Sequence, residues 1–132
     1  YISIHVPLSP QTHHLFGQKE FTKMKKTAFL INTSRGAVVN EKELQQALAE
    51  GALAGAALDV FDEEPIGKDH PLLQMENVFI TPHSGFFSVL SINDMRERVA
   101  MAIIQVFSGI YPKHIVNPKV KELIGNKLKE SV

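Results

Sequence analysis

Residues 27–65 read TAFLINTSRGAVVNEKELQQALAEGALAGAALDVFDEEP, and this stretch decides the fold. It begins with an apolar run, continues through a polar segment whose apolar residues have helical spacing, and returns to a second apolar run at residues 53–60. Short apolar runs of this kind are typical of strands that are buried on both faces of a parallel sheet. The stretch therefore predicts a strand–helix–strand unit, in which a crossover helix joins two parallel strands.

The helix between the two apolar runs has recognisable ends. Asn40 is expected to cap its first turn, because Glu43 follows three residues later in the arrangement of a capping box. Gly51 is placed to end the helix in a left-handed turn. The apolar stripe expected to face the sheet consists of Leu44, Ala47 and Leu48.

Strands and helices alternate along the rest of the chain as well. The further expected elements are strands at residues 1–6 and 77–81, a short helix at residues 18–24 and a long helix at residues 88–107. This alternation predicts an α/β fold with a doubly wound parallel sheet.

The last third of the chain contains the long helix and is less regular after it. Within the long helix, Met95 and Met101 are interpreted as core positions. Residues 110–120 are rich in proline and are predicted to be extended. Residues 125–132 are predicted to form a frayed helix or a tail.

The composition limits the possible classes of function. The 132 residues suit one domain, and 44% apolar residues are enough to build a core. Fourteen basic residues balance fourteen acidic ones, so we expect no nucleic acid as a partner. No apolar run approaches the roughly 20 residues that a membrane span requires. The absence of cysteine excludes disulfides, thiolate catalysis and Cys-ligated zinc, and it favours a cytoplasmic location.

The start of the chain indicates a piece of a longer protein. Tyr1 is not a methionine, and it lies inside an expected strand. Neither the G-x-G-x-x-G fingerprint nor a P-loop occurs in the sequence. If a dinucleotide binds, we therefore expect its pyrophosphate site upstream of Tyr1.

Three polar side chains follow apolar strands and are the candidate catalytic groups. They are Arg35 in INTSRG, Glu64 in DVFDEEP and His83 in ITPHSG. Ligands of open α/β sheets bind at the carboxyl ends of the strands, so we expect the three to meet around one cleft. A guanidinium, a carboxylate and an imidazole can hold a carboxylate substrate and move a proton at its neighbouring carbon. For each residue alone, a salt bridge, a solvated acidic loop or a simple turn is the commoner role.

Several longer segments resemble one known family. They are HVPLSPQTHHLF at 5–16, MKKTAFLINTSRGAVVNEKELQQAL at 24–48, GALAGAALDVFDEEP at 51–65, HPLL at 70–73, NVFITPHSG at 77–85 and NP at 117–118. In this order and spacing they resemble the D-isomer-specific 2-hydroxyacid dehydrogenases over nearly the whole chain. The resemblance implies that residues 1–108 are the C-terminal half of a Rossmann-type NAD-binding domain. Residues 109–132 would be an extended segment and tail returning toward a substrate domain.

The resemblance also implies an activity, namely hydride transfer between NAD(H) and a 2-hydroxy acid/2-keto acid pair. Arg35 would hold the carboxylate of the 2-keto acid. His83 would be the general acid that protonates its carbonyl oxygen. Glu64 directly precedes a proline, as the catalytic glutamate of the family does. It would hydrogen-bond His83, fix its tautomer and favour the imidazolium.

The cofactor-binding residues implied by the resemblance lie at the same strand ends, and no metal is expected. Asp59 would lie near the nicotinamide carboxamide. Gly85 would let the backbone approach the nicotinamide closely. A role of Gly85 in the turn alone is an equally good prediction. Thr12 would reach the polar rim of the adenosine site. The full set expected to contact NAD is Val6, Pro7, Thr12, Thr33, Ser34, Arg35, Asp59, His83 and Gly85.

Two other interpretations stay open. The segments SGFFS at 84–88, MRE at 95–97 and IYPKHIVNP at 110–118 look closer to members related to the C-terminal-binding proteins, which are NADH-responsive scaffolds that recruit partner proteins. Alternatively, the chain alone is inactive and leaves an apolar sheet edge or helix surface that needs a partner. For the intact protein the resemblance implies a homodimer. The acidic residue that separates NAD from NADP is expected in the upstream segment.

Overall fold

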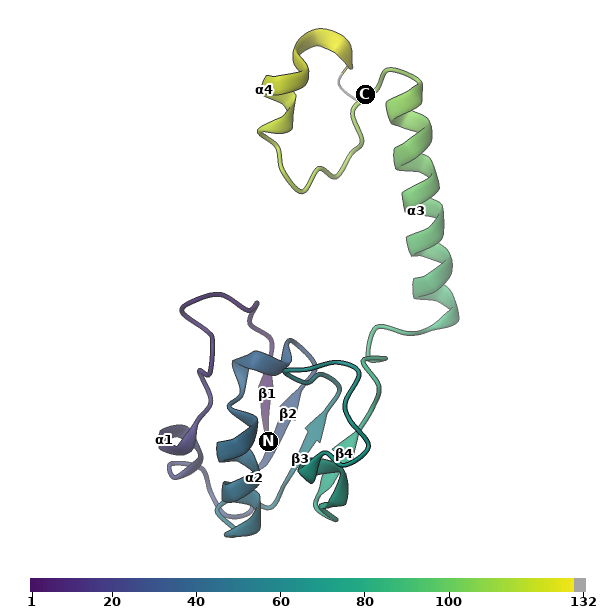
Figure 1. Cartoon of the computed structure of the whole chain (residues 1–132). Helices are drawn as coiled ribbons and strands as arrows, with labels where there is room; N and C mark the ends of the chain where they lie inside the picture. The colour runs from purple at the N-terminus through teal and green to yellow at the C-terminus, as the bar shows by residue number, and fades with distance from the viewer. Residues whose placement is uncertain (130–132) are drawn as a thin grey trace. The chain divides into compact units, whose positions relative to one another are not determined.

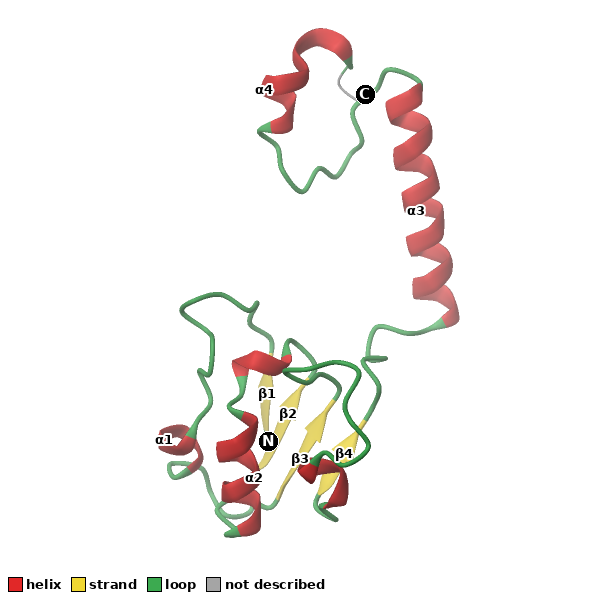
Figure 2. Cartoon of the chain, in the orientation of Figure 1, coloured by secondary structure: helices red, strands yellow, loops and turns green. Residues whose placement is uncertain are grey.

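The structure of the chain, a computed structural model, describes residues 1–129. Its elements form two compact units, Tyr1–Gly85 and a second unit that starts at Phe86. The expected division between residues 108 and 109 stays a prediction. Figure 1 follows the chain through its elements, and Figure 2 distinguishes the helices, strands and loops.

The first unit is built around a four-stranded parallel sheet (Figures 1 and 2). Its strands are β1 (Ile2–Ile4), β2 (Phe29–Asn32), β3 (Gly55–Leu58) and β4 (Val78–Ile80). The spatial order is β1-β2-β3-β4, so each strand pairs with the next one in the sequence. Ile4 pairs with Asn32, Asn32 with Leu58, and Leu58 with Ile80, so the four carboxyl ends lie along one edge. The predicted parallel α/β sheet is confirmed.

Short helical segments connect the strands. The α-helices of this unit are α1 (Gln18–Phe21) and α2 (Glu41–Ala49), and the 3₁₀ turns are Gly36–Val38 and Pro71–Gln74. Both α-helices begin within one residue of the predicted positions, whereas neither 3₁₀ turn was predicted. The connection from β3 to β4 contains the 3₁₀ turn at Pro71–Gln74 and no α-helix.

The ends of α2 follow from its sequence. The side chain of Asn40 accepts the backbone N–H of Glu43 at 3.3 Å, as predicted for an N-cap. The carboxylate of Glu43 is used differently from the predicted capping box, because its Oε2 accepts the N–H of Gln18 at 2.6 Å. This bond ties α2 to the start of α1. Gly51 adopts the expected left-handed conformation after the helix, with φ of 67°.

The core lies between α1, α2 and one face of the sheet. The three predicted stripe residues of α2 are buried in one cluster with Phe21 of α1 and Leu30 of β2. The side chains of the other sheet face are more open, since Phe29 and Phe79 are exposed. Within Tyr1–Gly85 the helices therefore cover one face of the sheet.

The second unit contains a long helix, α3 (Val89–Phe107), which matches the predicted helix and is capped by Ser88. The interpretation of Met95 and Met101 as core residues is wrong in this structure, because each is 49% exposed. Among the described residues of this unit, the only other α-helix has five residues, too few to cover the 19 residues of α3. No helix in the described part of the chain has both the length and the apolar character needed to cross a bilayer.

The end of the chain is partly helical. The segment predicted to be extended leads into α4 (Val120–Ile124), which was not predicted. A 3₁₀ turn at Gly125–Lys127 follows, consistent with the frayed helix expected there. The prediction for residues 130–132 lies outside the described residues.

The loop after β2 and the loop after β3 meet at Gly36. A Cβ atom on Gly36 would lie 1.9 Å from the carbonyl carbon of Phe61 and 2.3 Å from the backbone nitrogen of Asp62. Because these are backbone atoms, no change of side-chain rotamer could make room. The absence of a side chain at Gly36 thus allows the Arg35 loop to lie directly against the loop that carries Glu64.

We predict that Gly36→Ala lowers the free energy of unfolding of the chain by about 1–3 kcal/mol or more, because the added methyl group overlaps backbone atoms. Urea unfolding followed by circular dichroism measures this. Gly67→Ala is the matched control, since a Cβ there meets nothing within 4 Å, and we expect its effect to stay within about 1 kcal/mol. Equal free energies of unfolding for the two variants would contradict a close backbone contact at Gly36.

Candidate active site

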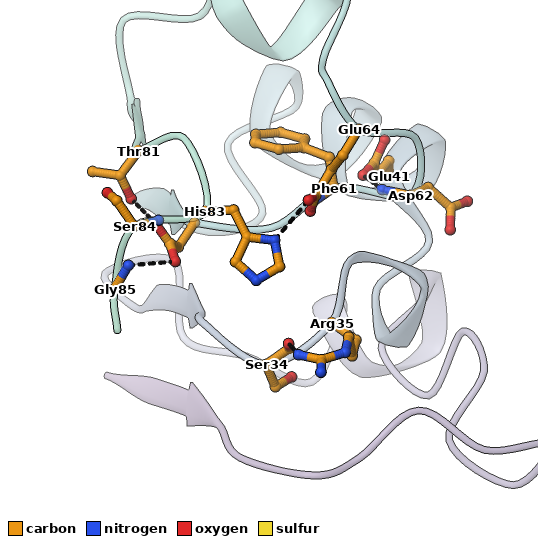
Figure 3. Close-up of polar contacts among 11 residues, drawn as sticks. Ser34, Arg35, Glu41, Phe61, Asp62, Glu64, Thr81, His83, Ser84 and Gly85 are labelled. Atoms are coloured by element: carbon orange, nitrogen blue, oxygen red, sulfur yellow. Dashed lines mark hydrogen bonds and ion pairs between the residues drawn. The ribbon is translucent and has the colours of Figure 1, made fainter. Parts of the chain in front are cut away.

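The three candidate catalytic side chains lie around one cavity of about 290 Å³. Arg35 follows β2, Glu64 belongs to the loop after β3, and His83 follows β4, so each comes from the carboxyl edge of the sheet. The other lining residues are Leu8, Gly36, Ala37, Phe61 and Asp62. Figure 3 shows the imidazole of His83 between Glu64 and Arg35. The structure therefore brings together the guanidinium, the carboxylate and the imidazole.

A short hydrogen bond joins His83 to Glu64. The distance from Nδ1 of His83 to Oε2 of Glu64 is 2.6 Å, and Oε1 of Glu64 accepts the N–H of Phe61 at 2.9 Å. The bond from His83, followed by that from Phe61, holds the pKa of Glu64 below its ordinary value of 4.5. An ionised carboxylate can only accept, so Nδ1 carries the proton. The second ring nitrogen, Nε2, lies on the side of Ser34 and Arg35 (Figure 3).

The backbone of His83 has an uncommon conformation. Its φ is 51°, in the left-handed region that residues other than glycine adopt infrequently. The N–H of His83 donates to the carbonyl oxygens of Asp59 at 2.8 Å and Thr81 at 3.1 Å. These bonds hold the turn after β4 in the conformation that directs the imidazole toward Glu64.

Asp59 organises the same turn through its side chain. Asp59 is buried, with 5% of the residue exposed, and its carboxylate accepts the hydroxyl of Thr81 at 2.5 Å and the N–H groups of Ser84 and Gly85 at 2.8 Å each. Burial by itself raises the pKa of Asp59, but the bonds from Thr81, Gly85 and Ser84 bring it below the ordinary value of 3.8. A Cβ on Gly85 would lie 2.9 Å from Oδ2 of Asp59, so the turn packs tightly on this carboxylate.

The loop after β2 is held by a buried amide. Asn32 accepts the N–H and the hydroxyl of Ser34 on Oδ1, at 3.1 and 2.9 Å, and its Nδ2 donates to the carbonyl oxygen of Arg35 at 3.0 Å. The side chain of Arg35 is exposed, and its Nη1 donates to the carbonyl oxygen of Ser34 at 2.6 Å. Thr33, between these residues, is exposed at the same edge.

The remaining residues expected to contact NAD lie in the loop after β1. Val6 is half-buried against the core, and Pro7 is exposed. The hydroxyl of Thr12 donates to the carbonyl oxygen of Pro7 at 2.6 Å and accepts the N–H of Ser9 at 2.8 Å. The structure thus places Val6 and Pro7 at the carboxyl end of β1, while the hydroxyl of Thr12 is engaged within its own loop.

Comparison with known proteins identifies the family. Residues 1–85 match the family model of the D-isomer specific 2-hydroxyacid dehydrogenase NAD binding domain. The chain belongs to this family. The match covers β1 to β4 and all three candidate catalytic residues. The predicted family is therefore confirmed, and so is the predicted fold class, part of a Rossmann-type NAD-binding domain.

Several members of the dehydrogenase family are similar to this chain. A glyoxylate reductase of Korarchaeum cryptofilum is 47% identical over 120 residues, which are 91% of this chain and 36% of that protein. Glyoxylate/hydroxypyruvate reductase B of Klebsiella pneumoniae is 43% identical over 121 residues, 92% of this chain and 38% of that protein. The crystal structure of D-lactate dehydrogenase with NAD⁺ from Lactobacillus jensenii superposes with a TM-score of 0.82 at 34% identity, covering 88% of this chain and 39% of that one. The chain spans little more than a third of the length of these relatives.

The subfamily to which the chain belongs is a separate question from its family. These likenesses do not show the expected closeness to the C-terminal-binding proteins, which stays a prediction. Within residues 1–129, no group of three or more His, Cys, Asp or Glu side chains is arranged to hold a metal ion.

Two residues of this candidate site were missed in the sequence. Asn32 was visible as an amide at the end of an apolar run, directly before the TSR segment. Glu41, the first residue of α2, accepts the N–H of Asp62 on Oε1 at 2.6 Å, and its Oε2 lies 3.3 Å from Nε2 of His70. It thus ties the loop that carries Glu64 to α2 at two points. No local pattern marked Glu41, because both partners are distant in the sequence.

We predict that Glu64→Gln lowers the free energy of unfolding at neutral pH, and that this deficit narrows as the pH falls. The pKa of Glu64 in the folded chain lies below its ordinary value of 4.5. The unfolded chain therefore takes up the proton first, so the stabilising contribution is complete above about pH 5 and is lost as the pH falls through the folded-state pKa.

Urea unfolding at a series of pH values between about 7 and 2 measures this difference. The control is Glu63→Gln, which changes the neighbouring exposed carboxylate of the same loop. A deficit for Glu64→Gln that stays constant over the whole pH range would exclude a paired carboxylate at this position.

Proposed function

We propose that this chain is the C-terminal half of the NAD-binding domain of a longer D-2-hydroxyacid dehydrogenase. The enzyme would transfer a hydride between NAD(H) and a 2-hydroxy acid/2-keto acid pair. The observation that carries this proposal is the cavity shared by Arg35, Glu64 and His83, with Nδ1 of His83 bound to Glu64. The names of similar proteins, glyoxylate reductase and D-lactate dehydrogenase, support a small 2-keto acid as the substrate.

Arg35 is the group that would bind the substrate carboxylate. A guanidinium has five N–H donors in a planar fork, and the bond to the carbonyl oxygen of Ser34 uses one of them. The fork can hold a carboxylate by two parallel hydrogen bonds, which fixes the direction of the adjoining carbonyl group. Binding at Arg35 would thus place the keto oxygen on the cavity wall that also includes His83.

His83 would move the proton. Since Glu64 accepts from Nδ1, the proton given to the keto oxygen during reduction leaves from Nε2, and oxidation returns it there. The negative charge of Glu64 stabilises the imidazolium before the transfer and keeps the ring oriented after it. The side chain of His83 is 43% exposed, so solvent can restore its proton. When bound, NADH supplies the hydride that the keto carbon receives.

The carboxyl edge of the sheet fits the nicotinamide half of NAD. Oδ2 of Asp59 accepts one bond, from Gly85, and a carboxylate oxygen can accept a further one from a carboxamide. Thr33 lies near Gly85, whose missing Cβ would be 4.0 Å from its methyl group, so small groups line this part of the edge. Thr33, Ser34 and Asp59 would hold the nicotinamide and its ribose, and Val6 would contact the adenosine.

We also propose that the longer protein acts as a homodimer in the cytoplasm. The apolar side chains exposed on α3 support the homodimer, because an exposed apolar surface of this kind is commonly covered by a partner in an assembly. A sequence without cysteine supports a reducing compartment. The 132-residue chain alone would lack the pyrophosphate site and is expected to be inactive.

In the longer enzyme, His83→Ala is expected to lower kcat for NADH-dependent reduction of glyoxylate by about 10²–10⁴-fold, because the general acid is lost. The dissociation constant of NADH, measured by fluorescence titration, should change by no more than about twofold. His114→Ala, which removes an imidazole from the second unit, is the control. A kcat that survived the change at His83 would remove this residue from the mechanism.

Arg35→Ala in the same enzyme is expected to raise KM and lower kcat together, so that kcat/KM for glyoxylate falls by about 100-fold or more, as expected for the loss of charge-assisted hydrogen bonds. Arg35→Lys should recover only part of this loss, since an ammonium cannot bind a carboxylate in the fork geometry. Arg96→Ala, on the exposed surface of α3, is the matched control for loss of a guanidinium. Unchanged kcat/KM in Arg35→Ala would refute the role of this residue.

A further inference from the structure

Asn32 is a buried polar residue, with 1% of its surface exposed. It ends β2, where the backbone pairs with Ile4 on one side and with Leu58 on the other. The carbonyl oxygen of Asn32 also accepts the N–H of Asp59 at 3.0 Å. The backbone of Asn32 is therefore held by both neighbouring strands, so its side chain is attached to a rigid part of the sheet.

The hydrogen bonds of this side chain go to the two residues after Thr33. Oδ1 accepts the N–H and the hydroxyl of Ser34, and Nδ2 donates to the carbonyl oxygen of Arg35. An amide is required for this pattern, because it supplies an acceptor and a donor from one planar group. An aspartate would lack the donor, and an apolar residue would lack both. The side chain thus closes the Ser34–Arg35 segment onto the end of β2.

Arg35 is held through the same peptide group. Its Nη1 donates to the carbonyl oxygen of Ser34, so the guanidinium is attached to the segment that Asn32 binds. On the other side of Arg35, Gly36 packs against the backbone of Phe61. The exposed guanidinium therefore extends from a backbone that is fixed before and after it.

From this geometry we infer that Asn32 is a positioning residue for Arg35, which it holds in the orientation that binds the substrate carboxylate. The inference rests on the proposed function of Arg35. Loss of the Asn32 amide leaves the positive charge of Arg35 in place but releases the backbone that directs it. Displacement of a substrate-binding group by about 1 Å can reduce the rate by about 100-fold. A purely structural role of Asn32 would instead affect stability whatever residue stands at position 35.

The test is a double-mutant cycle in the longer enzyme, with glyoxylate as substrate. Asn32→Asp is the principal variant because it keeps the shape and the acceptor for Ser34 but loses the donor to Arg35, and Asn32→Ala removes the whole interaction. We expect kcat/KM to fall by about 10–100-fold in the native background and by no more than about twofold in the Arg35→Ala background. The dissociation constant of NADH should change by no more than about twofold in Asn32→Asp, because this variant keeps the acceptor for Ser34.

Asn77→Ala is the matched control, since the amide of Asn77 binds the carbonyl oxygen of Ala54 away from Arg35. It should leave kcat/KM unchanged in both backgrounds. Equal losses for the Asn32 variants in the two backgrounds would overturn the inference, since Asn32 would then act independently of Arg35. If Arg35→Ala lowers kcat/KM and the Asn32 variants do not, the inference also fails while the proposed function stands. If Arg35→Ala itself has no effect, the proposed function fails.

Discussion

The contact between two backbone segments, at Gly36 and at Phe61, determines where the side chains of the candidate site can lie. The parallel sheet brings the loops to one edge, but a sheet edge alone leaves neighbouring loops free to separate. At Gly36 the loop after β2 has no side chain, so the loop after β3 rests directly on it. Arg35 directly precedes Gly36, and Glu64 lies three residues after Phe61. The guanidinium and the carboxylate, which come from loops after two different strands, therefore reach one cavity.

Three carboxylates stabilise the loops around this contact by accepting backbone N–H groups. Glu41 binds Asp62, Glu64 binds Phe61, and Asp59 binds Ser84 and Gly85. For Asp59 burial opposes ionisation, but its hydrogen bonds outweigh burial and the pKa is lowered. The pKa of Glu64 is lowered mainly through His83. The site is thus a set of loops held by fixed negative charges, with Arg35 as the exposed cation among them.

Local patterns were sufficient for the sheet and for α2, because burial on two faces and the Asn40 cap are visible within a few residues of sequence. The role of Glu41 could not be predicted, since its partner Asp62 is 21 residues away. The contact at Gly36 is likewise tertiary, and a glycine in a loop carries no sign of what approaches it. The spacing of apolar residues in α3 predicted the helix correctly. The same spacing predicted that Met95 and Met101 are buried, but it did not identify the residues that would pack against them. Both methionines are exposed in this structure.

The strand order also has a consequence for synthesis on the ribosome. Because each strand pairs with the one made immediately before it, the sheet of the first unit can grow by adding each strand beside the previous one. No later strand has to insert between two that are already paired. Every new strand closes a loop of similar, moderate length, which keeps the entropy lost at each step small. The emerging chain can therefore gain structure in the order in which it leaves the ribosome, and each new strand provides the edge with which the next one pairs.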